Sequence, residues 1–191
     1  MTESLYANIT LNDVQLAALY YPILIDLAKH KHCLTYGELV DKAKELYPEK
    51  EIVQNAIAVS AGRKLDVVRL FTDERGMPDL TSLIISKTTG ECGSGFTDHF
   101  DPEAARKKVF DFDWTDVSTD FDMYINSAKN QVTPRKKRKR EEAKKLMSEY
   151  YSSHKNYLPA NIADQRDHII ELLMEGFDSV YAYEQAVKNL V

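Results

Sequence analysis

The chain has 191 residues, of which 43% are hydrophobic and 29% are charged. This length suits one globular domain with an appendage or two small domains, and the apolar content favours a packed core over wholesale disorder. The formal net charge of −5, from 25 basic and 30 acidic residues, excludes a uniformly basic nucleic-acid binder but not a local basic surface.

Cysteine usage and apolar stretches indicate the compartment. Cys33 and Cys92 allow at most one disulfide, which favours free thiols in a reducing environment. Residues 1–9 lack the basic and apolar regions of a signal peptide. The apolar stretch at 16–27 is too short and too interrupted to span a membrane. We therefore expect a cytoplasmic protein with no membrane partner.

Charge is segregated along the chain. Between residues 98 and 122, eight acidic side chains stand against three basic ones, whereas between 134 and 145 eight basic side chains stand against two acidic ones. We expect a winged-helix-like α+β domain at 5–126, a linker at 127–136, and a helical tail at 137–191. The basic run lies where the linker enters the tail.

The first two elements are predicted to be helices. Asn12 or Asp13 is placed to cap the first helix, which Pro22 should kink or break. Thr35 is placed to cap the second, because Glu38 three residues later completes a capping box.

A third helix and a β-hairpin are expected to follow. The helix should run from about 51 to 70, with Gly62 as its weak point. Residues 80–86 are β-like, 87–90 suit a turn, and 93–96 would lie in or just after the return strand. Three helices followed by a β-hairpin is the order of a winged helix-turn-helix.

The region after the hairpin alternates aromatic and acidic residues. Phe110, Phe112 and Trp114 alternate with Asp111 and Asp113. This spacing predicts a short strand with an aromatic inner face and an acidic outer face.

The tail is predicted to be helical throughout. Helices are expected at 137–153 and at 164–174, with Gly176 ending the second, and Asp178 or Ser179 should cap a last helix. A helical hairpin of this size buries little apolar surface alone, so we expect it to dock on the first domain, self-associate or hold a protein partner.

Several short segments stand in the order found in one family of DNA-binding domains. They are Thr35-Tyr36-Gly37-Glu38-Leu39, Ala56-Ile57-Ala58-Val59, Pro78, Leu83-Ile84-Ile85, and Gly90 with Gly95-Phe96. On these segments, residues 34–96 resemble the DNA-binding domain of the O6-alkylguanine alkyltransferases and the alkyltransferase-like proteins. The resemblance implies a winged-helix shape, and it places Tyr36 by the DNA backbone.

The chain departs from that family at its reactive residues. The family's Pro-Cys-His-Arg is here Pro78-Asp79-Leu80-Thr81, so the alkyl-accepting thiol is missing. The arginine that replaces the flipped base in the stack would fall on Ile57, which cannot hydrogen-bond the orphaned base. The resemblance therefore argues against alkyl transfer.

Two groups of cations are candidates for contact with phosphates. A winged helix would present Arg63, Lys64 and Arg69 to a groove and its flanking phosphates, with Lys87 on the hairpin turn. The second group is the basic run, which comprises Arg135, Lys136, Lys137, Arg138, Lys139 and Arg140. The alternative interpretation of the basic run is a solvated linker without a binding role.

Tyrosines lie close to the basic run in the sequence. Tyr150, Tyr151 and Tyr157 are placed to stack on exposed bases.

Other functions remain open. The acidic-aromatic stretch 110–122, together with the helical tail, supports an adaptor subunit that binds proteins, unless its aromatic side chains cover the core. A metal-dependent nuclease is third, because Pro78-Asp79 with Lys87 resembles the PD-(D/E)xK pattern, although Ile85 occupies the position of its second acid.

One cluster of side chains that can bind a metal is present, but it gives little support for a metal site. His30, His32 and Cys33 cluster, but histidines at a helix C-terminus are more simply explained by the helix dipole. The sequence thus predicts a non-enzymatic protein that binds DNA or RNA, or belongs to a nucleoprotein assembly, without a metal or cofactor.

Overall fold

The computed structural model describes residues 7–115 and 117–190, and the chain divides into two compact units. Unit 1 ends at Thr133 and unit 2 begins at Pro134. Each unit has its own cluster of buried apolar side chains. The division lies within the predicted linker 127–136, but the first part of that segment is helical.

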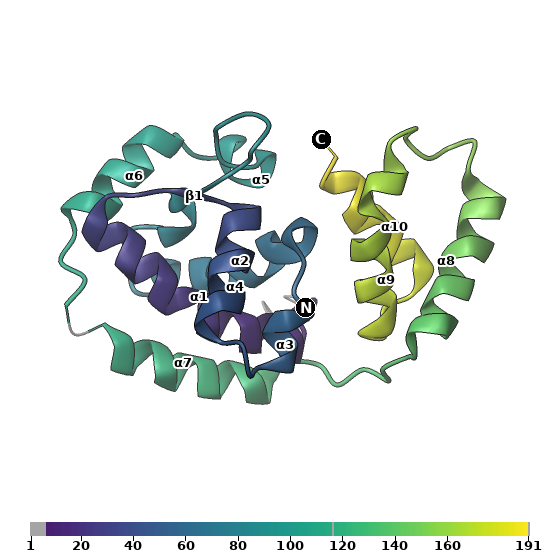
Figure 1. Cartoon of the computed structure of the whole chain (residues 1–191), viewed down its shortest axis with the longest axis horizontal. Coiled ribbons are helices and arrows are strands. Elements are labelled where there is room, and N and C mark those ends of the chain that lie inside the picture. Colours follow the sequence, from purple (N-terminus) through teal and green to yellow (C-terminus); the bar gives the residue numbers. More distant parts are fainter. Residues whose placement is uncertain (1–6, 116, 191) are drawn as a thin grey trace. The chain divides into compact units, whose positions relative to one another are not determined.

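Unit 1 is built from helices and one pair of short strands (Figure 1). Its longer helices are α1 (Leu11–His30), α2 (Tyr36–Leu46), α4 (Ala61–Glu74), α6 (Pro102–Asp111) and α7 (Ser118–Gln131). Its shorter elements are β1 (Leu34–Thr35), α3 (Glu51–Gln54), the 3-10 helices η1 (Ala58–Ser60) and η2 (Leu80–Leu83), β2 (Ile84–Ile85) and α5 (Ser94–Thr97). The prediction of a helix-rich chain with a small sheet is confirmed.

Helix α1 begins earlier than predicted and continues through its proline. Thr10, rather than Asn12 or Asp13, is the N-cap: the Asp13 N–H donates to Thr10 Oγ1, and the Thr10 N–H donates to Asp13 Oδ2, both at 3.0 Å. This capping box satisfies two backbone donors at once. Pro22 lies inside the helix, where it removes one backbone hydrogen bond. The side chains around it are buried in the core, and their packing offsets this loss.

The second predicted helix is confirmed and the third is divided. The Thr35 N–H donates to Glu38 Oε2 at 2.7 Å, and the Glu38 N–H donates to Thr35 Oγ1 at 3.3 Å. The helix predicted at 51–70 becomes α3, η1 and α4, interrupted before Gly62 rather than at it.

The predicted β-hairpin is wrong. The turn forms, because the Gly90 N–H donates to Ser86 O at 2.9 Å, but the chain beyond it enters α5. Strand β2 instead pairs in parallel with β1, with Leu34 opposite Ile84 and Thr35 opposite Ile85. A short apolar run indicates a buried strand without indicating its partner, which is why the sequence favoured the nearer segment.

The predicted strand at 110–114 is also wrong, since α6 continues to Asp111. Asp101 caps this helix by accepting from the backbone of its first turn. Beyond the helix, buried Trp114 donates from Nε1 to Val109 O at 2.7 Å, and the Phe112 ring packs on it with centroids 4.6 Å apart. The alternation of aromatic and acidic residues therefore spans a helix end and a loop.

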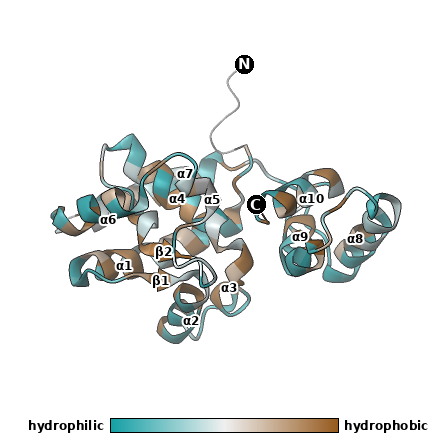
Figure 2. Cartoon of the chain, turned by 90° about the horizontal axis from the view of Figure 1, so that it is seen from above, coloured by the Kyte–Doolittle hydropathy of each residue, from teal (hydrophilic) through white to brown (hydrophobic). Residues whose placement is uncertain are grey.

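An aromatic cluster joins α1, α4 and α7. The rings of Tyr21 and Phe121 stack with centroids 3.7 Å apart, and Phe71 meets them edge-on at 5.6 and 4.9 Å. The Tyr124 hydroxyl donates to Val67 O at 3.3 Å. Apolar residues extend along much of α1 (Figure 2), so this helix forms the centre of the unit.

Asp13 also ties α1 to α4 through a buried charge cluster. Its Oδ2 accepts from Arg63 Nη2 at 3.0 Å, and its Oδ1 lies 3.4 Å from Lys64 Nζ, which donates to Ser60 Oγ at 2.9 Å. Asp13 and Lys64 are each only 2% exposed. Burial opposes ionisation of the Asp13 carboxyl, but the Lys64 and Arg63 charges outweigh it and lower its pKa.

Unit 2 consists of α8 (Arg140–His154), η3 (Ile162–Gln165), α9 (Arg166–Met174) and α10 (Ser179–Lys188). Asp178 caps α10 as predicted, because its Oδ1 accepts from the Tyr181 N–H at 2.8 Å. Helix α8 starts at Arg140 rather than at 137, so most of the basic run precedes it. Among the described residues, no helix is long and apolar enough to cross a membrane.

Replacement of Asp13 tests the buried cluster. Asp13→Asn should lower the free energy of unfolding at neutral pH by about 3 kcal/mol, because it leaves the Lys64 ammonium buried without its counter-charge. The folded-state pKa lies below the ordinary 3.8, so the stabilisation is complete above that value and is lost as the pH falls through the folded pKa. Urea denaturation from pH 7 to pH 2 should show the difference between variant and parent shrinking below about pH 4. A pH-independent difference would contradict this role.

Candidate functional site

The cations of α4 do not form the predicted groove-reading surface. Lys64 is 2% exposed and Arg63 is 15% exposed, and both face Asp13 inside unit 1. Arg63 Nη2 also donates to Asn8 O at 2.6 Å. The two residues stabilise the packing of α1 on α4, and these contacts disfavour the prediction that they bind phosphates.

Arg69 is similarly occupied by contacts within unit 1. Its Nε donates to Asp79 Oδ2 at 2.9 Å and its Nη2 donates to Thr81 Oγ1 at 3.0 Å. Its guanidinium lies 5.1 Å from the centroid of the Phe96 ring. The predicted contact of Arg69 with phosphate is therefore not favoured by its position.

The other two residues predicted for this surface differ in exposure. Tyr36 is half-buried at the start of α2, and burial raises the pKa of its hydroxyl. Lys87 is exposed in the turn after β2. Of the five residues predicted as unit 1 contacts, Lys87 is therefore the one that is exposed.

The basic run is an ordered part of unit 2 rather than a solvated linker. The Arg138 N–H donates to Met174 O at 2.9 Å. Its guanidinium Nη1 donates to Leu173 O at 2.9 Å and to Phe177 O at 2.7 Å, at the C-terminal end of α9. A cation at this end satisfies carbonyls that the helix leaves free and opposes its negative pole. The Arg135 guanidinium lies 4.1 Å from the Phe177 ring centroid.

Gly176 permits this close approach. Its φ of +96° is a conformation that other residues rarely adopt, and a Cβ there would lie 2.7 Å from Arg135 Cβ and 2.8 Å from Lys136 O. The sequence indicated only that Gly176 ends a helix. Its fit against a segment some 40 residues earlier in the chain has no local signal.

With Arg135 and Arg138 directed onto the unit, the lysines between and after them are exposed. Lys136 and Lys139 are exposed and make no ion pair with other described residues. Lys137 is 63% exposed and its Nζ lies 3.1 Å from Glu175 Oε1. Arg140 is 53% exposed and lies 3.3 Å from Asp167 Oδ1. The Arg140–Asp167 pair is exposed on both sides, and such pairs are worth at most about 1 kcal/mol, so Arg140 can exchange partners.

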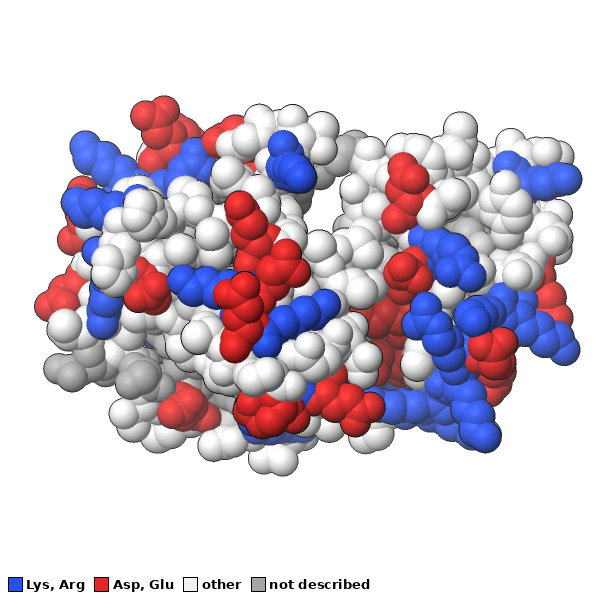
Figure 3. Space-filling model, in the orientation of Figure 1, with Lys and Arg blue, Asp and Glu red and all other residues white. Residues whose placement is uncertain are grey.

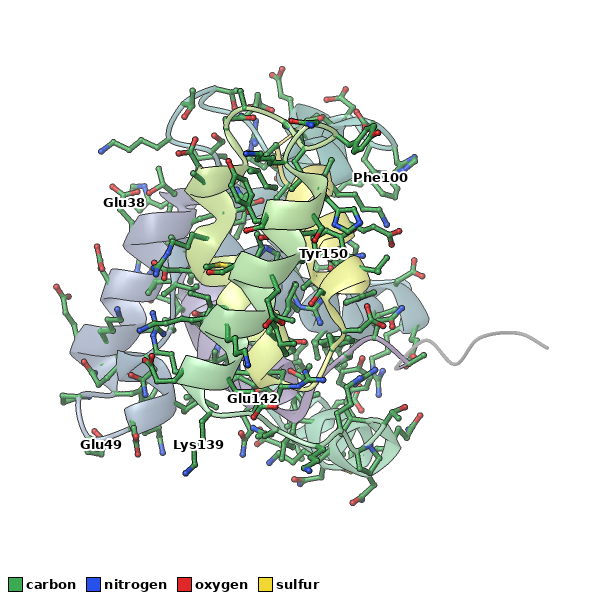
Figure 4. The ribbon with its side chains drawn as sticks, turned by 90° about the vertical axis from the view of Figure 1, so that its right-hand side faces the viewer. Glu38, Glu49, Phe100, Lys139, Glu142 and Tyr150 are labelled. Carbon is green, nitrogen blue, oxygen red and sulfur yellow. The ribbon has the colours of Figure 1, made fainter. Side chains whose placement is uncertain are left out.

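The cationic surface continues along the first turns of α8. Lys144 and Lys145 lie in the basic region 134–145 but outside the set of predicted contact residues, and Lys145 is 76% exposed. Figure 3 shows Lys and Arg side chains gathered over the start of α8. In Figure 4, Lys139 extends away from the ribbon. We define the basic surface as Lys136, Lys137, Lys139, Arg140, Lys144 and Lys145.

The two units differ in charge. Residues 134–191 hold 11 basic and 9 acidic side chains, whereas the rest of the chain holds 14 and 21. The net charge of −5 thus combines an acidic unit 1 with a slightly basic unit 2, whose cations are concentrated at one end of α8.

The thiols do not suit nucleophilic chemistry. Burial raises the pKa of Cys92 to about 11, and its Sγ donates to Ser82 O at 3.4 Å. Cys33 is also a free thiol whose pKa is raised by burial. Both are protonated at neutral pH and are therefore weak nucleophiles.

The nuclease hypothesis has little support at Asp79. Its carboxylate accepts from Arg69 and, through Oδ1, from the Thr81 N–H and hydroxyl at 2.9 and 2.6 Å. These contacts use it as the cap of η2. Across 7–115 and 117–190, no three His, Cys, Asp or Glu side chains gather as metal ligands.

Comparison of the chain with models of known protein families, with curated proteins and with solved structures finds no match. The candidate site therefore rests on its geometry. The resemblance of residues 34–96 to alkyltransferase DNA-binding domains stays a prediction.

Substitution of Gly176 tests the attachment of the basic run. Gly176→Ala should destabilise unit 2 by about 1–3 kcal/mol, because the left-handed conformation disfavours alanine and its Cβ would meet Lys136 O. Hydrogen exchange of the Arg138 amide should accelerate in the variant.

The matched control is Gly62→Ala within α4, where a Cβ meets nothing within 4 Å. There alanine should be neutral or stabilising by up to about 1 kcal/mol. Unchanged exchange at Arg138 in Gly176→Ala would show that the basic run is not held as described.

Proposed function

We propose that the chain is a non-enzymatic nucleic-acid-binding protein that contacts the phosphate backbone through unit 2. The observation that carries this proposal is the fixed basic run, in which Arg138 bonds the end of α9 while Lys136 and Lys139 are exposed. Cations that are already ordered lose less conformational entropy on binding than the same cations on a flexible linker. Arg140 and Lys144 extend the phosphate-contacting surface.

Contact through unit 1 is a weaker candidate. The winged-helix shape implied by the resemblance would use α4, but Lys64 is buried and Arg63 is held by Asp13. The acidic excess of unit 1 would also repel a polyanion. We therefore confine the proposed contact to the basic surface, with DNA or RNA as the partner.

The adaptor hypothesis has less to support it. Of the aromatic side chains in 110–122, Trp114 and Phe121 are buried and belong to the core of unit 1. Phe112 is 37% exposed, and its ring packs on Trp114. Asp111, Asp113 and Asp122 are exposed, but a protein interface normally places aromatic groups at its centre.

The exposed lysines of the basic run provide the test. Lys136→Gln/Lys139→Gln should weaken binding of a labelled oligonucleotide, because each lysine contributes a phosphate contact. Fluorescence anisotropy at several salt concentrations should show the slope of log K against log salt reduced by roughly 1 for each lysine removed.

Lys107→Gln/Lys108→Gln is the matched control, because these lysines are exposed on α6 in unit 1 and their loss changes the net charge equally. It should leave the slope nearly unchanged. Equal effects of the two double variants would show that binding depends on net charge and not on the basic surface, which would contradict the proposed contact. Absence of binding by the parent chain at low salt would overturn the proposed function.

A further inference from the structure

Helix α8 presents cations and a tyrosine on one face. At 100° per residue, Arg140, Lys144, Tyr151 and Lys155 fall within about 60° of one another around the helix axis. We call these four residues the α8 stripe. The buried side of the helix carries Ala143 instead, so the α8 stripe lies beside the core-facing side.

The carboxylates of α8 are placed away from most of the stripe. Glu142 and Glu149 fall on the opposite side of the helix, and Glu149 lies 3.8 Å from Lys145 Nζ. Glu141 is nearer the stripe, but its Oε1 accepts from Lys144 Nζ at 2.8 Å. An anionic chain following the stripe would therefore meet cations at both ends of the helix.

Aromatic side chains are exposed at the C-terminal end of the same helix. Tyr151 is 46% exposed and Tyr157, just beyond the helix, is 88% exposed. Tyr150 is not comparable, because its ring stacks on His154 at 3.9 Å and on Tyr183 at 4.6 Å. Of the three residues predicted to stack on bases, Tyr151 and Tyr157 are therefore exposed to a ligand, whereas Tyr150 packs against the core of unit 2.

A hollow is lined by residues from the second half of α8, from the segment after it and from α10. Leu158, which follows Tyr157, lines a cavity of about 300 Å³ together with Tyr150, Tyr183 and Val187. Its lining is mainly apolar, with Glu184 and Lys188 also present.

We propose that unit 2 binds single-stranded nucleic acid more tightly than double-stranded nucleic acid, along the α8 stripe. This inference rests on the proposed function and deepens it. Phosphates lie along Arg140, Lys144 and Lys155, and unpaired bases stack on Tyr151 and Tyr157. A positively charged track combined with aromatic rings is how proteins hold single strands without reading their sequence.

The dimensions of the helix agree with such a strand. The 15 residues of α8 span about 22 Å at 1.5 Å per residue, a length that accommodates several nucleotides. A duplex offers its phosphates to the same cations, but its bases are stacked on each other and closed to the tyrosine rings. The tyrosines should therefore matter for single strands and the lysines for both forms.

The double variant Tyr151→Ala/Tyr157→Ala in the full chain separates base stacking from phosphate contact. Anisotropy with a thymidine oligonucleotide, its uridine counterpart and a duplex of equal length should show single-strand affinity reduced at least about fivefold for each stacking ring lost. Duplex affinity should be unchanged. Tyr151→Phe/Tyr157→Phe retains the rings and should bind like the parent. The two single strands compare DNA with RNA.

The outcomes distinguish this inference from the proposed function. Unchanged single-strand affinity in the alanine variant, with binding still weakened by Lys136→Gln/Lys139→Gln, would overturn the inference and leave the proposed function in place. Equal losses for single strand and duplex would also overturn it, because stacking could not be the cause. Absence of binding to every oligonucleotide by the parent chain would overturn both.

Discussion

The attachment of Arg138 to the end of α9 is the interaction on which the candidate site depends. Its guanidinium donates to Leu173 O and Phe177 O, and its N–H donates to Met174 O, so side chain and backbone hold the same segment. Gly176 makes the approach possible, because any Cβ there would meet the passing chain. A run of like charges that would otherwise be flexible is thereby fixed with a definite set of lysines exposed.

The two groups of cations show how position decides the role of a charge. Lys64 lies beside the buried Asp13 carboxylate, where removal from water is tolerable only because the charges compensate each other. Lys136 and Lys139 lie on the surface of unit 2, where water solvates them and a phosphate can replace that water. Both groups carry the same chemistry, and the former stabilises the fold whereas the latter is available to a partner.

Local signals were sufficient for some elements and insufficient for others. A cap involves neighbours within three residues, so the sequence identifies Thr35 and includes Asp178 among two candidates, although it misses Thr10 at the start of α1. The prediction of a hairpin was wrong because β2 pairs with β1, which lies far earlier in the chain. Packing of the core decides this pairing, and a local pattern does not indicate it. The prediction of a strand at 110–114 was wrong because alternating aromatic and acidic residues also occur where α6 ends at Asp111 and the following loop buries Trp114. The basic run was found from composition, but its order came from contacts with Gly176 that no spacing indicates.

Hydrogen exchange with and without a bound oligonucleotide tests the central claim most directly, because it locates the contact without a substitution. We expect slower exchange in the basic run and the first turns of α8, with α4 and the turn at 86–90 unaffected. Protection centred on α4 and that turn, with unit 2 unchanged, would contradict the assignment of nucleic-acid contact to the basic surface.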